Sequence, residues 1–178
     1  EHPTQALLDI YTIRENFGKL EGLKVAVIGD FLNSRVARSN IKMFKKMGLE
    51  TTIVSPTMLL PEDEASLGLE IEHSIDRVIR KADIIYMLRM QFERQDRKFY
   101  PSIEEYNKFL SLDTDRFFSL KENSIVMHPG PVNRGIEISE ELMDLADSNE
   151  EIARKFKISK QVTNGVAIRM ALLYLILG

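Results

Sequence analysis

Four short apolar runs, each the length of one strand and apolar on both faces, most constrain the fold of this chain. They lie at residues 23–28, 51–54, 83–88 and 124–127, and helical stretches separate them. A strand that is apolar on both faces must be covered on both, which is typical of a parallel sheet packed between helices. The pattern therefore predicts an α/β fold: a doubly wound parallel sheet with helices on both faces, in three Rossmann-like layers.

Helices are predicted between and around these strands. The first starts beside Pro3 and ends at Gly18, while Ser34 is placed to N-cap the helix after the first strand, which Gly48 closes. No repeat, low-complexity tract or Gly/Ser linker divides the chain, so we expect one domain over residues 1–178. The expected helices cover residues 4–17, 36–47, 62–67, 75–81, 103–110, 114–119 and 160–177, and a weak strand is expected at 69–72.

The composition excludes several classes of function. Lys and Arg number 24 against 27 Asp and Glu, so the net charge of −3 offers no broad basic surface for nucleic acid. Cysteine is absent, which removes disulfides, thiolate nucleophiles and cysteine metal sites and fits a reducing compartment, the cytoplasm. The apolar stretch 166–177 is too short to span about 30 Å of hydrocarbon and contains Arg169, so we expect no membrane insertion.

Two His-Pro segments stand where regular elements begin or end. Residues 2–5 read His-Pro-Thr-Gln at a helix start, where the side chains of His2 and Gln5 can project from a helix mouth that favours anions. Residues 128–131 read His-Pro-Gly-Pro and follow the last strand, at the edge of the sheet where open α/β folds bind ligands. Both segments are therefore candidate ligand-binding sites, although a single His-Pro pair is more often an ordinary turn.

Two arginines follow predicted strands at that same edge. Arg35 comes after the first strand at a helix start, a place that repels a cation unless an anion lies nearby. Arg89 and Gln91 follow the strand at 83–88 and, being two residues apart, share one side of an extended chain. Each arginine can form a bidentate pair with a carboxylate, so the two together suit a ligand with two carboxylates.

The segment 89–98 carries four cations directly after a strand and opens a long polar stretch. Long loops in compact domains are usually functional or disordered. Two interpretations stay open here: a solvated surface loop, or a mobile loop that responds to a ligand.

Other ligand chemistries find no support in the sequence. Gly29 lacks the further glycines of G-x-G-x-x-G, which argues against a nucleotide-dependent dehydrogenase, and there is no P-loop. The histidines have no metal-ligand spacing, and His73 is expected at the surface. Asp30 is expected to hydrogen-bond within its own turn rather than to act as a catalytic acid. We therefore expect neither a cofactor nor a metal.

Taken together, residues 2–5, 29–39, 88–94, 128–135 and 161–170 resemble the aspartate carbamoyltransferase family, in the order in which that family carries them. The resemblance covers only the second half of the family's catalytic chain. It implies the aspartate-binding domain, whose helices at about 4–17 and 160–177 pack toward a missing N-terminal carbamoyl phosphate domain. The chain starts at Glu1 without an initiator Met, and we expect it to be a piece of a longer protein.

The resemblance implies that the chain contributes part of a carbamoyl phosphate site. His2 resembles the histidine that donates to the carbamoyl carbonyl oxygen. The carbamoyl amino group would be held by Gln5 and by the backbone carbonyls of Pro129 and Gly130. Pro131 belongs to the same substrate-binding segment. The reaction implied is transfer of the carbamoyl group from carbamoyl phosphate to L-aspartate, giving N-carbamoyl-L-aspartate and phosphate in pyrimidine biosynthesis.

The aspartate site follows from the same resemblance. Arg35 would bind the α-carboxylate of L-aspartate, and Arg89 and Gln91 would bind its β-carboxylate. Glu93 and Arg94 fall in the loop that moves when the family's two domains close. The partners implied are a homotrimer of full-length catalytic chains, with regulatory or dihydroorotase subunits as further candidates.

Two alternatives remain at this point: an isolated, non-catalytic dicarboxylate-binding domain, and a related carbamoyltransferase that accepts another amino acid. The spelling around Arg134 belongs to one branch of the family, and the sequence assigns this residue no role.

Overall fold

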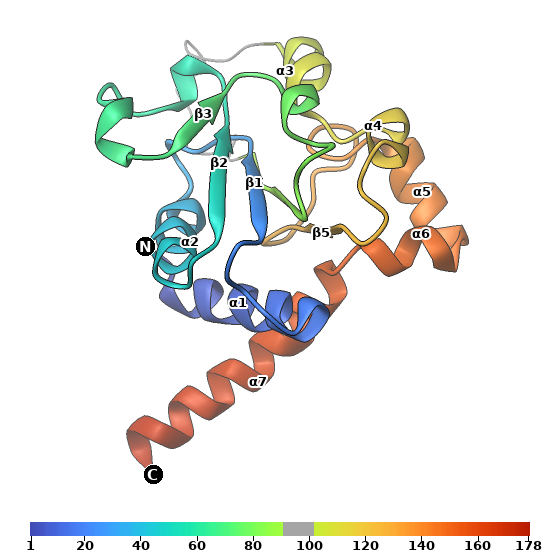
Figure 1. Ribbon diagram of the computed structural model, residues 1–178. Helices are drawn as coiled ribbons and strands as arrows, with labels where there is room; N and C mark the ends of the chain where they lie inside the picture. The colour runs from blue at the N-terminus through green and yellow to red at the C-terminus, as the bar shows by residue number, and fades with distance from the viewer. Residues whose placement is uncertain (91–101) are drawn as a thin grey trace.

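The computed structural model describes residues 1–90 and 102–178, and its centre is a five-stranded parallel sheet in the order β3-β2-β1-β4-β5 (Figure 1). All neighbouring strands run parallel, and Ile28 of β1 lies opposite Val54 of β2 and Met87 of β4. This confirms the predicted doubly wound α/β fold. The strands are β1 (Lys24–Ile28), β2 (Glu50–Val54), β3 (Glu70–Glu72), β4 (Ile84–Met87) and β5 (Ile125–Met127).

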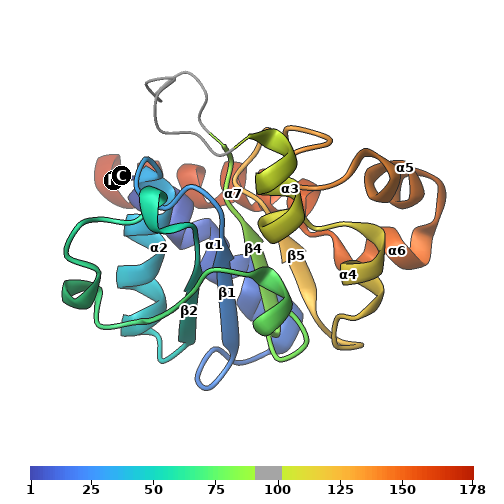
Figure 2. The same cartoon turned by 90° about the horizontal axis from the view of Figure 1, so that it is seen from above.

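Helices cover both faces of the sheet, as the apolar strands require (Figures 1 and 2). On one face lie α1 (Pro3–Phe17) and α2 (Arg35–Lys46), with α7 (Ile158–Leu177) packed against α1. The opposite face carries α3 (Ile103–Leu110), α4 (Thr114–Phe118), α5 (Glu140–Ser148), α6 (Glu150–Lys155) and the 3₁₀ turn η3 (Ile75–Arg77). Two further 3₁₀ turns, η1 (Thr57–Leu59) and η2 (Glu64–Leu67), follow β2.

Each face of the sheet has its own apolar core, because alternate strand residues point to opposite sides. Ala26 and Ile28 of β1 face the α3–α6 layer, whereas Val25 and Val27 face α1 and α2. In the second core the Tyr86 ring meets Phe44 edge to face, with ring centroids 6.4 Å apart.

The predicted helix signals act as expected. The Ser34 hydroxyl accepts the N–H of Ala37 at 3.1 Å and caps α2, while Gly18 ends α1 with a left-handed φ of 70°. These two ends matter for function, because α1 and α2 bring the candidate residues His2 and Arg35 to their positions.

Three local expectations differ from the structure. The helix predicted at 75–81 is only the 3₁₀ turn η3, and the chain continues through further turns into β4. The helix predicted at 62–67 is likewise the 3₁₀ turn η2. Helices α5 and α6 went unpredicted because they are short and mostly polar; Ser139 and Asn149 cap their first turns.

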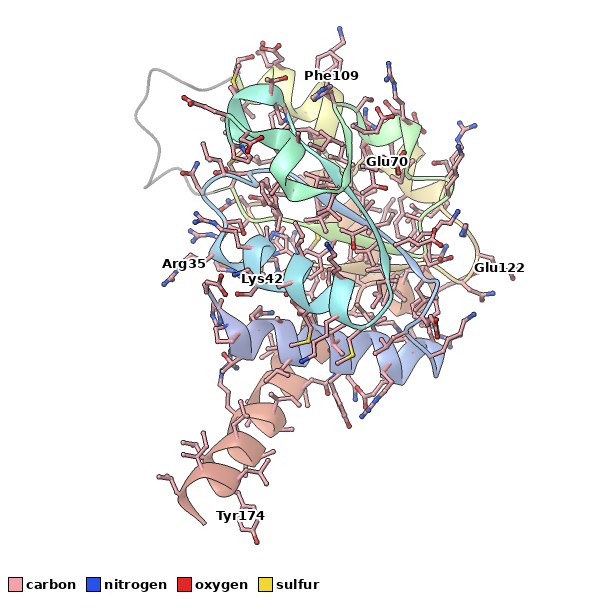
Figure 3. The ribbon with its side chains drawn as sticks, turned by 60° about the vertical axis from the view of Figure 1, so that its left-hand side comes forward. Arg35, Lys42, Glu70, Phe109, Glu122 and Tyr174 are labelled. Carbon is pink, nitrogen blue, oxygen red and sulfur yellow. The ribbon has the colours of Figure 1, made fainter. Side chains whose placement is uncertain are left out.

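The last helix extends beyond the body of the domain (Figure 1). Its buried residues all lie in the first turns, and most of the apolar side chains beyond them are exposed, with Tyr174 at 78% near the far end (Figure 3). No helix in the described ranges 1–90 and 102–178 is both long and apolar enough to cross a bilayer.

Candidate functional site

The order in which the chain adds strands reverses between β1 and β4, which makes this the switch point of the sheet. From β1 the chain continues to β2 and β3 on one side, and β4 continues to β5 on the other. Ligands of open α/β sheets bind beyond the carboxyl ends of the strands at such a switch point. The segments after β1, β4 and β5 carry Arg35, Arg89 and His128, so the topology places these three at one edge of the sheet, after neighbouring strands.

The turn after β1 is built to present Arg35. Gly29 has a φ of 121°, and Asp30 accepts hydrogen bonds from the backbone N–H of Asn33 at 3.2 Å and from its side-chain amide at 3.0 Å. Asp30 therefore organises the turn, as predicted. Arg35 follows the Ser34 cap as the first residue of α2, where its exposed side chain lies at the surface (Figure 3).

Arg89 follows β4 and is half-buried. It lies close enough to His128 for its charge to act on the imidazole. Burial first and the Arg89 charge second lower the pKa of His128 from 6.5 to about 3, so the ring is neutral. Its Nδ1 accepts the N–H of Gly130 at 2.9 Å, which leaves the proton on Nε2. Nε2 lies 3.8 Å from Oε2 of Glu137, and because the ring is neutral this contact is not an ion pair.

Glu137 joins the end of β4 to the loop after β5. Its carboxylate is fully buried and accepts the backbone N–H groups of Met90 at 2.7 Å and Asn133 at 2.6 Å. Burial raises the pKa of this carboxyl, and the hydrogen bonds oppose the rise. Glu137 was not predicted from the sequence; the available signal was a lone carboxylate between Ile136 and Ile138.

His2 stands at the mouth of α1. Its backbone N–H donates to Oγ of Ser39 at 2.8 Å, which ties the helix start to α2. Burial lowers the pKa of the imidazole, and the charges of Arg169 and Arg35 lower it further, in that order. His2 therefore faces two cations as a neutral group that can donate one hydrogen bond. Arg169 is an addition to the predicted set, since the sequence indicated only that it interrupts an apolar stretch.

Gln5 is buried, one turn into α1, and its amide nitrogen donates to Asp9 at 3.0 Å. Pro129 and Gly130 follow the buried His128 and are half-buried, whereas Pro131 is exposed; the Gly130–Pro131 peptide is cis and Gly130 has a φ of 74°. The two His-Pro segments thus lie at the start of α1 and directly after β5.

The remaining predicted positions fall elsewhere. Gln91, Glu93 and Arg94 lie outside the described residues. Arg134 is exposed and forms ion pairs with Asp144 and Asp147 of α5, which gives it a surface role. His73 is exposed, as predicted, and its Nδ1 lies 2.9 Å from the carbonyl oxygen of Ser55.

A hollow of about 860 Å³ lies away from these groups. Its wall includes Phe17 at the end of α1 and Ser124 just before β5, at the amino edge of the sheet. None of the candidate residues lines it. In the part of the chain that the structure describes, no cluster of acidic or histidine side chains is arranged to hold a metal ion.

Comparison with known proteins shows which family this domain belongs to. The family model described as aspartate/ornithine carbamoyltransferase, Asp/Orn binding domain, matches residues 21–176. The chain belongs to this family.

Relatives within the family are similar along the whole chain. The aspartate carbamoyltransferase catalytic subunit of Thermobifida fusca is 48% identical over 178 residues, and that of Syntrophomonas wolfei is 49% identical. The aspartate transcarbamoylase of Trypanosoma cruzi, solved with carbamoyl phosphate, superposes with a TM-score of 0.80 at 31% identity, over 98% of this chain and 55% of that one. The chain spans about half the length of the curated relatives it matches: 100% of it aligns with 54% of the Thermobifida protein.

Proposed function

We propose that this chain is the aspartate-binding domain of an aspartate carbamoyltransferase, which transfers the carbamoyl group of carbamoyl phosphate to L-aspartate. The observation that carries the proposal is the position of Arg35 and Arg89 after β1 and β4, on the two sides of the switch point. Two guanidinium groups there suit a short dicarboxylic acid. The names of the relatives support this substrate over ornithine, whose side chain is a cation.

In the proposed mechanism the aspartate amine attacks the carbamoyl carbon. A C–N bond forms, the C–O bond to phosphate breaks, and an amine proton passes to the departing phosphate. Negative charge develops on the carbonyl oxygen during the attack. His2 donates to that oxygen through the one ring N–H that a neutral imidazole carries. Gln5 and the carbonyls of Pro129 and Gly130 accept from the carbamoyl amino group. Catalysis in this scheme is mainly positioning and oxyanion stabilisation.

The site requires more than this chain. The exposed apolar residues of α7, together with α1, would pack toward the N-terminal domain that binds the phosphate group. A homotrimer of complete chains, a cytoplasmic location and a role in pyrimidine biosynthesis belong to the same proposal, as do Gln91 as a second ligand of the β-carboxylate and Glu93 and Arg94 as part of a domain-closure loop.

Replacement of Arg89 tests the assignment in the complete enzyme. Arg89→Ala should raise the KM for aspartate about 10- to 100-fold, because a charge-assisted bidentate contact is lost. Arg154→Ala, an exposed cation of α6, is the matched control and should leave this KM unchanged. Unchanged aspartate kinetics in Arg89→Ala would discredit the proposed binding site.

The isolated 178-residue chain distinguishes the enzyme from a simple binding domain. We expect it to be inactive by itself, because the phosphate-binding half of the site is supplied from elsewhere. Turnover by this chain alone would show that it carries a complete active site and would contradict the proposal.

A further inference from the structure

Asp9 is a fully buried carboxylate that receives four side-chain hydrogen bonds from four different elements. Its Oδ1 accepts from Nε2 of Gln5 at 3.0 Å and from Nε2 of Gln161 at 2.8 Å. Its Oδ2 accepts from Nδ2 of Asn40 at 2.8 Å and from the hydroxyl of Tyr86 at 2.6 Å. The two oxygens therefore have separate partners: two glutamine amides on one side, an asparagine and a tyrosine on the other.

The two glutamines are oriented by this carboxylate. A carboxamide carries its oxygen and its NH₂ group on opposite sides, and an ionised carboxylate can only accept hydrogen bonds. Because the NH₂ of Gln5 points at Asp9, its Oε1 points the other way, as an acceptor. Gln161 is held in the same manner, and its Oε1 accepts the backbone N–H of His128 at 2.9 Å.

Both amides lead to groups that the proposed reaction uses. Gln5 is a proposed acceptor for the carbamoyl amino group, and the other two acceptors are the carbonyls of Pro129 and Gly130. These directly follow His128, whose N–H is held by Gln161. A single oxygen, Oδ1 of Asp9, thus accepts hydrogen bonds from both glutamines that position the three acceptors.

We propose that Asp9 is a positioning residue for recognition of the carbamoyl group: its Oδ1 aims the acceptor oxygen of Gln5 and, through Gln161, holds the strand end from which Pro129 and Gly130 follow. This inference rests on the proposed function. Asp9 touches no substrate and acts only through the two glutamines.

The competing view is that Asp9 has only a structural role, in which its hydrogen bonds hold α1 against α2, α7 and β4. The two oxygens allow the views to be separated. Tyr86→Phe removes a donor from Oδ2 and leaves both glutamines hydrogen-bonded to Oδ1. It therefore weakens the contact between α1 and β4 without releasing either glutamine amide. Asp9→Leu removes both acceptor oxygens, so neither Gln5 nor Gln161 keeps the group that fixes its amide.

The experiment compares these two variants in the complete enzyme, with kinetics in both substrates and thermal unfolding midpoints. We expect both variants to unfold at lower temperature. Asp9→Leu should lower kcat/KM for carbamoyl phosphate about tenfold or more, the effect of buried amide groups left without their acceptor. Tyr86→Phe should leave that value within about twofold, since no acceptor of the carbamoyl group is disturbed. Equal kinetic effects, or no kinetic effect in Asp9→Leu, would overturn the inference.

Gln161→Met keeps the test decisive if Asp9→Leu does not fold. It removes only the link between Asp9 and His128 and should raise the KM for carbamoyl phosphate by about threefold or more; an unchanged KM overturns the inference. Failure of the function itself gives a different result, because the wild-type enzyme would then form no carbamoyl aspartate at all.

Discussion

His128 and Asp9, two buried groups at the candidate site, should make the stability of this chain respond to acid in opposite directions. The pKa of His128 is lowered from 6.5 to about 3 by burial and by Arg89. Below about pH 6.5 the unfolded state therefore binds a proton that the folded state does not. The free energy of unfolding consequently decreases as the pH is lowered. From about pH 7.5 to about pH 5 the loss from His128 is roughly 2 kcal/mol.

Asp9 acts with the opposite sign. Burial raises the pKa of its carboxyl from 3.8 to about 6, against the effect of its hydrogen bonds. Between these values the folded state holds a proton that the unfolded state releases, so this group adds to the free energy of unfolding as the pH is lowered. The gain is roughly 1.5 kcal/mol over the same interval, which offsets most of the loss from His128.

His128→Asn should uncover the Asp9 contribution. The Asn oxygen can accept the N–H of Gly130 in place of Nδ1, but it does not titrate. In urea unfolding followed by far-UV circular dichroism, lowering the pH from about 7.5 to about 5 should raise the free energy of unfolding of the variant by roughly 2 kcal/mol relative to that of the wild type. Parallel pH profiles for the two proteins would refute the placement of a neutral, buried imidazole beside Arg89.

Two further changes test other parts of the structure. Gly29→Ala should destabilise the chain by about 2 kcal/mol or more, because φ is 121° there and a Cβ would lie 2.9 Å from the hydroxyl of Tyr106; a loss below about 0.5 kcal/mol in urea unfolding would contradict this backbone geometry. Met170→Asp, at a side chain that is 64% exposed on α7, should leave the stability of this chain within about 0.5 kcal/mol. It should nevertheless weaken the packing of α7 on the rest of the complete enzyme and lower its melting temperature, and an unchanged melting temperature would place the missing domain elsewhere.

The sheet could be predicted because its signals are local. Each apolar run contains its own strand, and Ser34 and Gly18 cap or end their helices through contacts within a few residues. Arg35 and Arg89 could be selected because a cation at a helix start and one just after a buried strand are costly without an anion.

The network behind the site could not be predicted in the same way. Asp9 meets Gln161 across 152 residues, and Glu137 meets Met90 across 47, so no spacing pattern reveals either contact. In the sequence, Asp9 looks like an ordinary polar residue of an amphipathic helix. Its burial follows only once α1, α2, α7 and β4 are packed together.

The substrate of the complete enzyme tests the central claim most directly. Carbamoyl phosphate should be offered with either L-aspartate or L-ornithine, and the carbamoylated products measured. The two arginines at the switch point predict N-carbamoyl-L-aspartate as the product, with ornithine left unmodified. Carbamoylation of ornithine in preference to aspartate would contradict the proposed site.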